Sequence, residues 1–421
     1  MRTTKILLLL FLCTTFSCKL AAAEQSITLE AATALALQTN PNIAVVLRGR
    51  EVESAQALQA ASRPNPTLSG QIEDLRSQNR IATIAISQQL ETAGKRDKRM
   101  AAADATLAMA DADIVIAQAE ISAKTYAAFY QVLAAQQAQT LAQELLQIAT
   151  TSKQTTAKRV LAGKVSPVEE TKAKVAEAGL KIDLANASQQ LLSAKQRLTS
   201  SWKVGLEANI HEDYRAVGEL EKLGNIPTLD DLMAQLTDSP RLKKASLAVT
   251  QKQALSAIEQ SKQTPDVTVS LGAQRNEELG GITQAIIGLS IPIPVFDKNQ
   301  GNLQSAKAHE YQSIDEKTVL ENQLRTELVD AYSRSQLQVE ASNMYQQEIL
   351  PGAQSAYEAA RKGFEFGKFS FLEVLDAQRT LFQAKTQHLQ TLALARIAEA
   401  DIQHILGVNY TSGTNYSREL P

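Results

Sequence analysis

The chain has 421 residues, of which 44% are hydrophobic but only 5% aromatic, and it contains just 18 Gly and 11 Pro. Turns use Gly and Pro, so this scarcity predicts long uninterrupted helices and argues against a doubly wound α/β enzyme, which needs Gly at its βα turns. The composition also excludes collagen-like, disulfide-rich and mostly disordered chains. The formal net charge of −2 provides no basic excess for binding nucleic acid.

The first 23 residues have the three regions of a secretory signal peptide. Two basic residues precede an apolar run at 6–12, and Ala21-Ala22-Ala23 fits an A-x-A cleavage site. Cleavage after this site would also remove both cysteines, Cys13 and Cys18. The exported chain is therefore expected to have no disulfide and no thiolate metal site. Cys18 as a lipidated first residue stays open as an alternative.

The first long element is a helical hairpin. Residues 67–166 contain no Pro, and apolar residues recur every seven positions from Lys95 to about Leu161. A single helix over this stretch would be ~100 Å long at 1.5 Å per residue. Gly163 is expected to end it, and Ser166-Pro167 is expected to start a second helix that runs to about Thr199.

A second hairpin is expected near the end of the chain. Residues 297–363 are predicted to form one helix with a kink at Pro351-Gly352. Ser370 is the expected N-cap of a last helix ending near Leu406.

Four short segments have the alternating pattern of strands instead. Each is about ten residues long, which is the length of a strand that crosses a membrane in a β-barrel. They are residues 67–76, 81–89, 266–274 and 282–291. Short polar loops near 77–79 and 277–280 join them in two pairs.

The chain is an internal duplication with an offset of about 200 residues. The strand pair at 66–90 returns at 265–293, and residues 163–169 return as 367–373 with Gly, Lys, Ser and Glu at the same spacing. Shared turn chemistry, with Gly at a C′ position and Ser at an N-cap, explains the matching Gly and Ser. It does not explain the matching Lys and Glu.

These elements restrict the architecture. Four strands cannot close a membrane barrel, which needs at least eight, and an open edge in lipid leaves backbone groups unpaired. Several chains must therefore share one barrel if these strands cross a membrane. Each strand pair has helices at both outer ends, so both helical hairpins are expected on the same, periplasmic side.

Over residues 28–407 the sequence resembles the TolC family of outer-membrane efflux channels. The similarity is most specific in residues 364–378, where Phe-x-x-Gly is followed by Ser370, Glu373 and Val-Leu-Asp-Ala-Gln. Residues 89–96 and 289–297 are most similar to the heavy-metal branch, of the cobalt–zinc–cadmium resistance type.

The resemblance implies a homotrimer in outer-membrane lipid, with a twelve-stranded barrel and a long α-helical tunnel in the periplasm. It also implies a periplasmic adaptor and an inner-membrane pump of the resistance-nodulation-division class as partners. The expected segments are a signal peptide (1–23), helices of the first repeat (24–65), a β-hairpin (66–90), a helical hairpin (94–200), an equatorial linker (201–226), helices of the second repeat (227–264), a second β-hairpin (265–293), a second helical hairpin (297–407) and a tail (408–421).

The resemblance also implies a gate at the closed periplasmic end, made by rings of acidic residues. By position these are Glu373 and Asp376, with Glu169 as the matching acid on the first hairpin. A ring of like charges repels itself and binds cations. The alternative is that Glu373 is an ordinary first-turn residue favoured by the helix dipole and Asp376 an ordinary surface charge. The family's latch Arg is absent, because Phe369 stands at its position after Lys368.

The two hairpin tips are the expected adaptor-docking sites, although a plain helix–turn–helix connection is the simpler interpretation. The tip residues are Gly163, Lys164, Ser166, Gly367, Lys368 and Ser370.

No cofactor and no metal site are expected. None of the four histidines, at 211, 309, 388 and 404, pairs with another at helical spacing. No nucleotide-binding, hydrolase or zinc-protease motif is present, so an enzyme is disfavoured. A drug efflux channel of the same family remains an alternative. A periplasmic adaptor or a coiled-coil scaffold is less consistent with the duplication and the strands.

Overall fold

A computed structural model describes residues 25–202 and 214–408 of the chain. The expected signal peptide at 1–23 and nearly all of the expected tail at 408–421 lie outside the described residues, as does the middle of the linker expected at 201–226.

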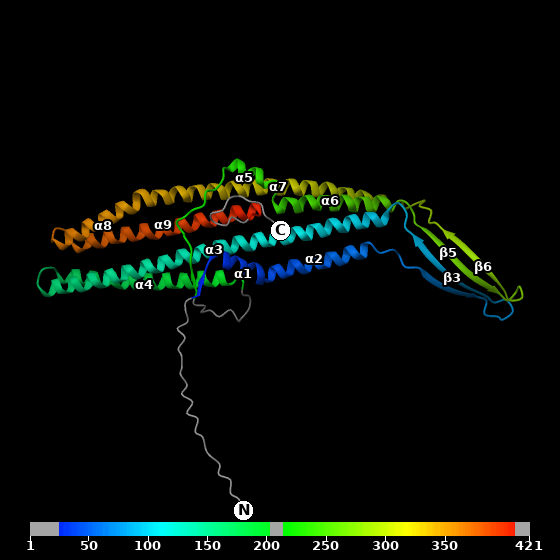
Figure 1. The fold of residues 1–421 in the computed structure, drawn as a ribbon, viewed down its shortest axis with the longest axis horizontal. Coiled ribbons are helices and arrows are strands. Elements are labelled where there is room, and N and C mark those ends of the chain that lie inside the picture. Colours follow the sequence, from blue (N-terminus) through cyan, green and yellow to red (C-terminus); the bar gives the residue numbers. More distant parts are fainter. Residues whose placement is uncertain (1–24, 203–213, 409–421) are drawn as a thin grey trace, which may run out of the picture.

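Two long helical hairpins make up most of the molecule (Figure 1). The first consists of α3 (Lys95–Leu161) and α4 (Pro167–Thr199), which have the predicted bounds. The second consists of α7 (Gln300–Met344), a π-helical segment (Tyr345–Ile349), α8 (Leu350–Glu365) and α9 (Phe371–Leu406).

The expected kink at Pro351-Gly352 lies slightly earlier than predicted. Pro351 and Gly352 are inside α8, and the departure from α geometry is the π-helical segment just before it. Pro has no N–H, and its ring clashes with the carbonyl four residues earlier. A wider π turn, in which the Leu350 N–H bonds to the Tyr345 carbonyl, accommodates this clash without ending the rod.

Each half of the chain also has a pair of shorter helices that precede its strands. They are α1 (Leu29–Thr39) and α2 (Pro41–Ala60) in the first half, and α5 (Leu229–Leu236) and α6 (Pro240–Ser261) in the second. α2 packs on α3, α3 on α6 and α6 on α7, so α2 and α7 are the outer helices of one layer (Figure 1).

All four predicted strands form one antiparallel sheet at the far end of the helices (Figure 1). They are β2 (Thr67–Glu73), β3 (Ile81–Leu90), β5 (Val267–Asn276) and β6 (Ile282–Ser290). The order is β2-β3-β5-β6, so the central pair joins the two halves of the chain and β2 and β6 are open edges. Every residue of β2 is exposed.

A second, two-stranded sheet lies near the middle of the helices, and the sequence did not predict it. β1 (Gln25–Ile27) pairs in parallel with β4 (Tyr214–Ala216). Beside it lies an aromatic core that includes Tyr126, Phe129 and Trp202. The same core also contains Tyr130 and Tyr214.

Arg396 fastens the linker after β4 to this core. Its side chain is 1% exposed, and its guanidinium donates to the Tyr126 hydroxyl (3.0 Å), to Glu399 (2.9 Å) and to the carbonyls of Glu219 and Lys222. It also lies 4.3 Å from the centre of the Tyr130 ring. A single buried cation therefore ties α3, α9 and the linker together.

Candidate gate and docking tips

Both long hairpins turn at the end of the molecule opposite the four-stranded sheet (Figure 1). The two turns are built alike. In the first, the Lys164 N–H donates to the Arg159 carbonyl (2.9 Å) and the Gly163 N–H to the Val160 carbonyl (2.9 Å). These are the two bonds of a Schellman motif, which requires a left-handed residue, and Gly163 has φ +66°.

The second turn repeats this geometry. The Lys368 N–H donates to the Gly363 carbonyl (2.8 Å), the Gly367 N–H donates to the Phe364 carbonyl (3.0 Å), and Gly367 has φ +72°. The duplicated Gly residues thus have the turn role that shared helix-capping chemistry predicts. Both lysines take part through their backbones, and their side chains are exposed.

The helices that follow both turns start at the predicted serines. The Ser166 hydroxyl accepts from the Val168 N–H (3.3 Å). Ser370 forms a full capping box, in which its hydroxyl accepts from the Glu373 N–H (3.4 Å) and the Glu373 carboxylate accepts from the Ser370 N–H (2.6 Å). The matching Glu in the duplicated segment is therefore also part of helix-start chemistry on the second hairpin.

The three candidate gate acids have different surroundings. Glu373 is held by the capping box, whereas Asp376, three residues further along α9, is exposed and makes no ion pair within the described chain. Glu169 lies on the other hairpin, is half-buried, and is 3.6 Å from the Lys172 ammonium. Of the three, Asp376 has the carboxylate most available to a neighbouring molecule or ion.

Arg159 joins the two tips, and sequence reasoning missed it. From the last turn of α3 its guanidinium donates to the Phe364 carbonyl (3.2 Å) and lies 4.3 Å from the centre of the Phe364 ring. Phe364 also contacts Phe371 at the start of α9, at 5.6 Å between ring centres. The sequence signal that could have revealed this contact is a basic residue in the last turn of α3 and an aromatic residue in the last turn of α8.

Phe369 stands where the family's latch Arg is expected, but it stays within its own tip. A Cβ added to Gly363 would lie 2.2 Å from the Phe369 ring, so the ring rests directly on the Gly363 backbone. Phe369 therefore closes its own turn, and the link to the other hairpin is made by Arg159.

Lys153 and Glu177 brace the first hairpin behind its tip. The Lys153 ammonium donates to both carboxylate oxygens of Glu177, at 2.9 and 2.8 Å, and Thr150 adds a third bond at 3.0 Å. These donors hold the pKa of Glu177 below its ordinary value, led by the bond from Lys153. The pair links α3 to α4 within the first hairpin.

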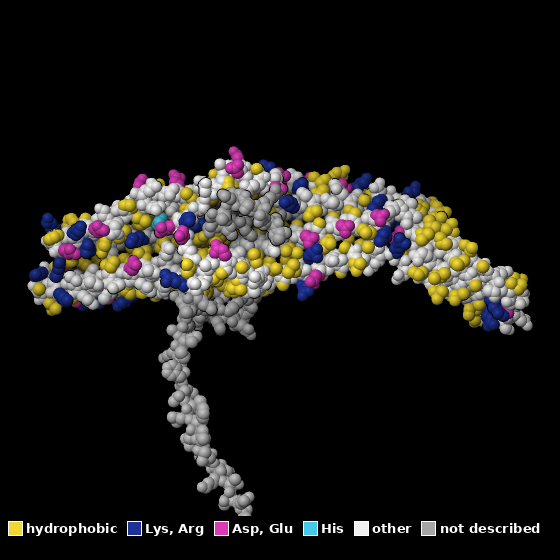
Figure 2. All heavy atoms as spheres, in the orientation of Figure 1, with side chains coloured by type: hydrophobic (Ala, Val, Ile, Leu, Met, Phe, Trp, Pro, Cys, Tyr) yellow, Lys and Arg dark blue, Asp and Glu magenta, His cyan; other side chains and the backbone are white. Residues whose placement is uncertain are grey.

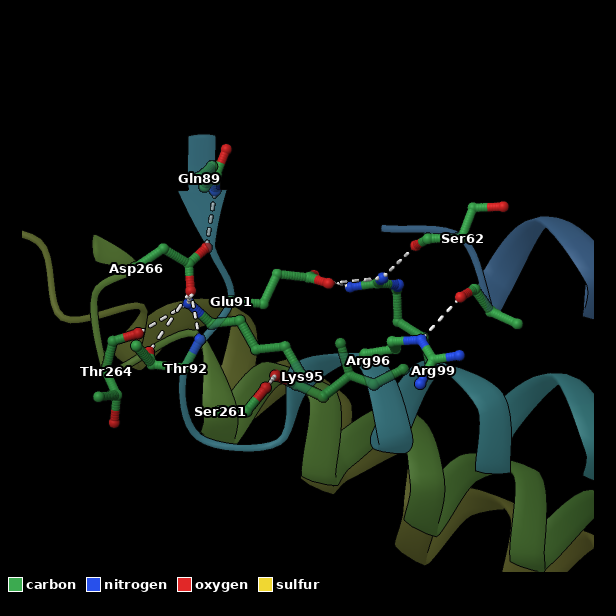
Figure 3. Close-up of polar contacts among 12 residues, drawn as sticks. Ser62, Gln89, Glu91, Thr92, Lys95, Arg96, Arg99, Ser261, Thr264 and Asp266 are labelled. Atoms are coloured by element: carbon green, nitrogen blue, oxygen red, sulfur yellow. Dashed lines mark hydrogen bonds and ion pairs between the residues drawn. The ribbon is translucent and has the colours of Figure 1, made fainter. Parts of the chain in front are cut away.

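At the opposite end, a polar cluster joins the strands to the helices (Figure 3). The Lys95 ammonium donates to Asp266 (2.5 Å) and to the Thr264 carbonyl (2.8 Å), and Asp266 also accepts from the Thr92 N–H (3.0 Å). Beside it, Arg99 pairs with Glu91. The cluster clamps the first half of the chain to the second just below the sheet.

The described residues contain no group of His, Cys, Asp or Glu side chains that could hold a metal ion. His388 contacts the Ser342 hydroxyl at 3.3 Å, and His309 contacts Gln312 at 3.3 Å. His404 is half-buried in α9, and His211 lies outside the described residues. None of the helices within 25–202 and 214–408 combines the length and apolar character that crossing a membrane requires.

Each half of the chain contributes one long helical hairpin at one end of the molecule and one β-hairpin to the single open-edged sheet at the other. This duplicated arrangement is that of a channel subunit. The chain belongs to the outer membrane efflux protein family, whose model matches residues 32–202 and 233–408. It is accordingly an outer-membrane protein that serves efflux.

The relatives agree with this assignment. The chain is 38% identical to the cobalt-zinc-cadmium resistance protein CzcC of Cupriavidus metallidurans over 386 residues, which are 91% of each chain. It is 29% identical to the cation efflux system protein CusC of Escherichia coli K12 over 153 residues, or 34% of this chain and 33% of CusC.

Solved structures show the same fold. A crystal structure of CusC superimposes with a TM-score of 0.74 over 90% of this chain and 92% of that one, at 18% identity. The outer membrane protein VceC of Vibrio cholerae gives 0.74 over 91% and 97%, at 20% identity. The predicted combination of a helical rod with barrel strands is confirmed.

Proposed function

We propose that this protein is a homotrimeric exit duct for heavy-metal cations, which a periplasmic adaptor connects to an inner-membrane pump of the resistance-nodulation-division class. The cargo is inferred from the relative with 38% identity over 91% of the chain, a cobalt-zinc-cadmium resistance protein. The described residues provide no metal-binding cluster. In this proposal the cation passes through as cargo, and the pump selects among cations.

The observation that carries the proposal is the four-stranded sheet with two open edges, β2 and β6. Unpaired strand edges are not tolerated in lipid, and a barrel removes them by closure. Three copies, each with four strands, supply twelve strands, which is an even number within the range of outer-membrane barrels. The long hairpins below the sheet then form the wall of the periplasmic tunnel.

The adaptor is proposed to dock on the two tips. Besides the duplicated Gly, Lys and Ser residues, the tips expose large apolar side chains: Leu161 is 89% exposed and Phe366 is 78% exposed. Exposed apolar groups next to lysines suit a partner with an apolar hairpin tip and acidic flanks.

The gate is proposed to consist of the carboxylates at Asp376, with Glu373 and Glu169 as secondary members, and of the Arg159 clasp. Three exposed Asp376 side chains around one axis would repel one another and attract cations. Arg159 holds the second tip against the first. Outward movement of α8 and α9 would break this contact, so the clasp favours the closed end.

The cargo is tested by deleting the gene and measuring growth in zinc, cobalt, cadmium, copper and lipophilic drugs. We expect increased sensitivity to one or more of the metals and none to the drugs, with rescue by the wild-type gene. Sensitivity to drugs alone would favour the organic-compound channel instead.

A further inference from the structure

The segment between β6 and α7 is apolar and uncovered. Residues 291–298 are all exposed, and they include Ile293 at 82% and Phe296 at 93%. Figure 2 shows hydrophobic side chains gathered over the sheet and its junction with the helices. Residues 291–296 are called the apolar linker below. Water around so many apolar groups is unfavourable, so this segment needs a partner surface.

The first half of the chain has a counterpart, residues 91–94 between β3 and α3. Gly94 and Asn299, the residues just before α3 and α7, are both left-handed, with φ +66° and +57°. Lys95 therefore corresponds to Gln300. In contrast to the apolar linker, the first-half loop is short and polar, and it packs on residues 264–266 of the second half (Figure 3).

The surface that receives this loop is also duplicated. Residues 261–266 begin at the last residue of α6, and residues 62–67 lie just after α2. The two segments have Ser, a basic residue and Pro at matching positions. The second-half corner is covered, and its Pro265 and Asp266 are partly buried. The first-half corner is open: Asn65, Pro66 and Thr67 are all exposed. Within the described chain, the apolar linker therefore packs on no such corner, and the first-half corner is covered by no such linker.

The outer strands and helices of the molecule indicate where the apolar linker can contact an open corner. Inside the chain, β3 pairs with β5 and α3 packs on α6. The equivalent elements β6 and α7 lie on one edge of the molecule, and β2 and α2 lie on the other. A head-to-tail ring of copies brings these edges together in the same relation. We infer that the apolar linker of one copy packs on the open corner, residues 62–67, of the next copy.

This inference rests on the proposed trimer, and it assigns different chemistry to the two junctions. The junction inside the chain uses the Lys95–Asp266 ion pair. At the equivalent positions between copies stand Gln300 and Thr67, which are neutral. Burial of the apolar linker takes the place of the missing ion pair. A shallow, open depression whose lining includes Ser62, Arg63 and Pro64 adjoins the open corner.

The contact is tested by disulfide crosslinking in outer membranes. Asp297 and Thr67 correspond to Thr92 and Asp266, which touch inside the chain. After oxidation, the Asp297→Cys/Thr67→Cys protein should give covalent dimers and trimers on a non-reducing gel. The matched control, Thr92→Cys/Asp266→Cys, should form its disulfide at monomer mass, and Asp297→Cys alone should give no ladder. Both native cysteines, Cys13 and Cys18, lie in the expected signal peptide, whose removal would leave no native thiol to crosslink.

The apolar character is tested by comparing two exposed phenylalanines. Phe296→Ser should lower the temperature at which the detergent-solubilised trimer dissociates. Phe366→Ser, at the tip and 78% exposed, should leave it unchanged. Equal effects, or none from Phe296→Ser, would contradict apolar packing between copies.

The apolar linker could instead be covered by lipid, and Trp fluorescence distinguishes a lipid contact from a contact with a neighbouring copy. Trp202 is the only Trp, so a Trp202→Phe/Phe296→Trp protein reports on position 296 alone. Weak quenching by brominated phospholipid is expected for a protein contact. Strong quenching, or a trimer without the crosslink ladder, would overturn the linker contact and leave the trimer standing. A monomer in detergent would overturn the proposed function itself.

Discussion

Two carboxylates at the start of α9 are already distinguished by what they bind. Glu373 is engaged with the Ser370 backbone, and Asp376 is free of ion pairs in the described chain. If Asp376 is part of the proposed gate, Asp376→Ala removes charge from the constriction only. We therefore expect it to raise single-channel conductance in planar bilayers without changing thermal stability.

Glu373 needs two variants, since its charge and its capping role are separate. Gln also forms capping boxes, so Glu373→Gln removes the charge and keeps the helix start. Glu373→Ala removes both and should cost about 1 kcal/mol of local stability. If conductance changes only in Glu373→Ala, the residue is a cap and not a member of the gate.

Arg159 gives the clearest expectation for the closed state. A cation–π contact is worth about 1 kcal/mol, and a hydrogen bond from a charged group about 1.5 kcal/mol or more. Both contacts join one guanidinium to one residue, so they are not fully additive, and their joint loss is about 2 kcal/mol. If the closed state alone makes these contacts, this loss would shift the closed–open balance roughly 30-fold. Arg159→Ala should therefore increase the open probability in bilayer recordings. Lys158→Ala removes the same charge from the neighbouring exposed position and should have little effect.

Among the elements, the π-helical segment at 345–349 lies beside a buried histidine. The His388 ring is 6.0 Å from the Tyr345 ring and bonds to Ser342, and burial lowers its pKa below the ordinary 6.5. Between about pH 6.5 and the lower pKa of the folded chain, the unfolded chain binds a proton at this position that the folded chain does not bind. Folded-state stability is therefore expected to decrease as the pH falls through that range.

The measurement is the thermal unfolding temperature between pH 8 and pH 5. The decrease in the wild type should be larger than in His388→Gln, which cannot take up the proton. Burial also lowers the pKa of His404, so part of the decrease should persist in the variant. An identical pH profile in both proteins would contradict a role for His388.

For the whole molecule, the expectation is the oligomeric state. Because β2 and β6 leave the sheet open, detergent-solubilised protein should have three times the mass of the exported chain by light scattering. Substituting Pro at Ile287 in the open-edge strand β6 should reduce the trimer, because Pro removes a ladder donor. Release from membranes as a monomer without detergent would contradict the channel.

Much of this architecture could be predicted because its signals are local. Heptads and the lack of Pro specified the 67 residues of α3, and alternation specified all four barrel strands. Gly163, Gly367, Ser166 and Ser370 were identified as turn and cap residues, since capping depends on neighbours within a few positions.

Contacts between distant segments left no such signal. The Arg159–Phe364 clasp spans 205 positions, and the Arg396 bond to Tyr126 spans 270. Pairing of β1 with β4 joins three-residue strands, too short for a periodic pattern. Such contacts depend on how the two halves pack, which periodicity within one half does not encode.

The sequence by itself thus determined the rods, the strands, their duplication and the family, because helix and strand periods and breaker residues are written within single segments. Only the tertiary structure decided which edges remain open and which cation links the tips. Those properties arise where segments some 200 positions apart come into contact. The scarcity of Gly and Pro explains the long rods, and the packing of the two halves explains how the rods are held together.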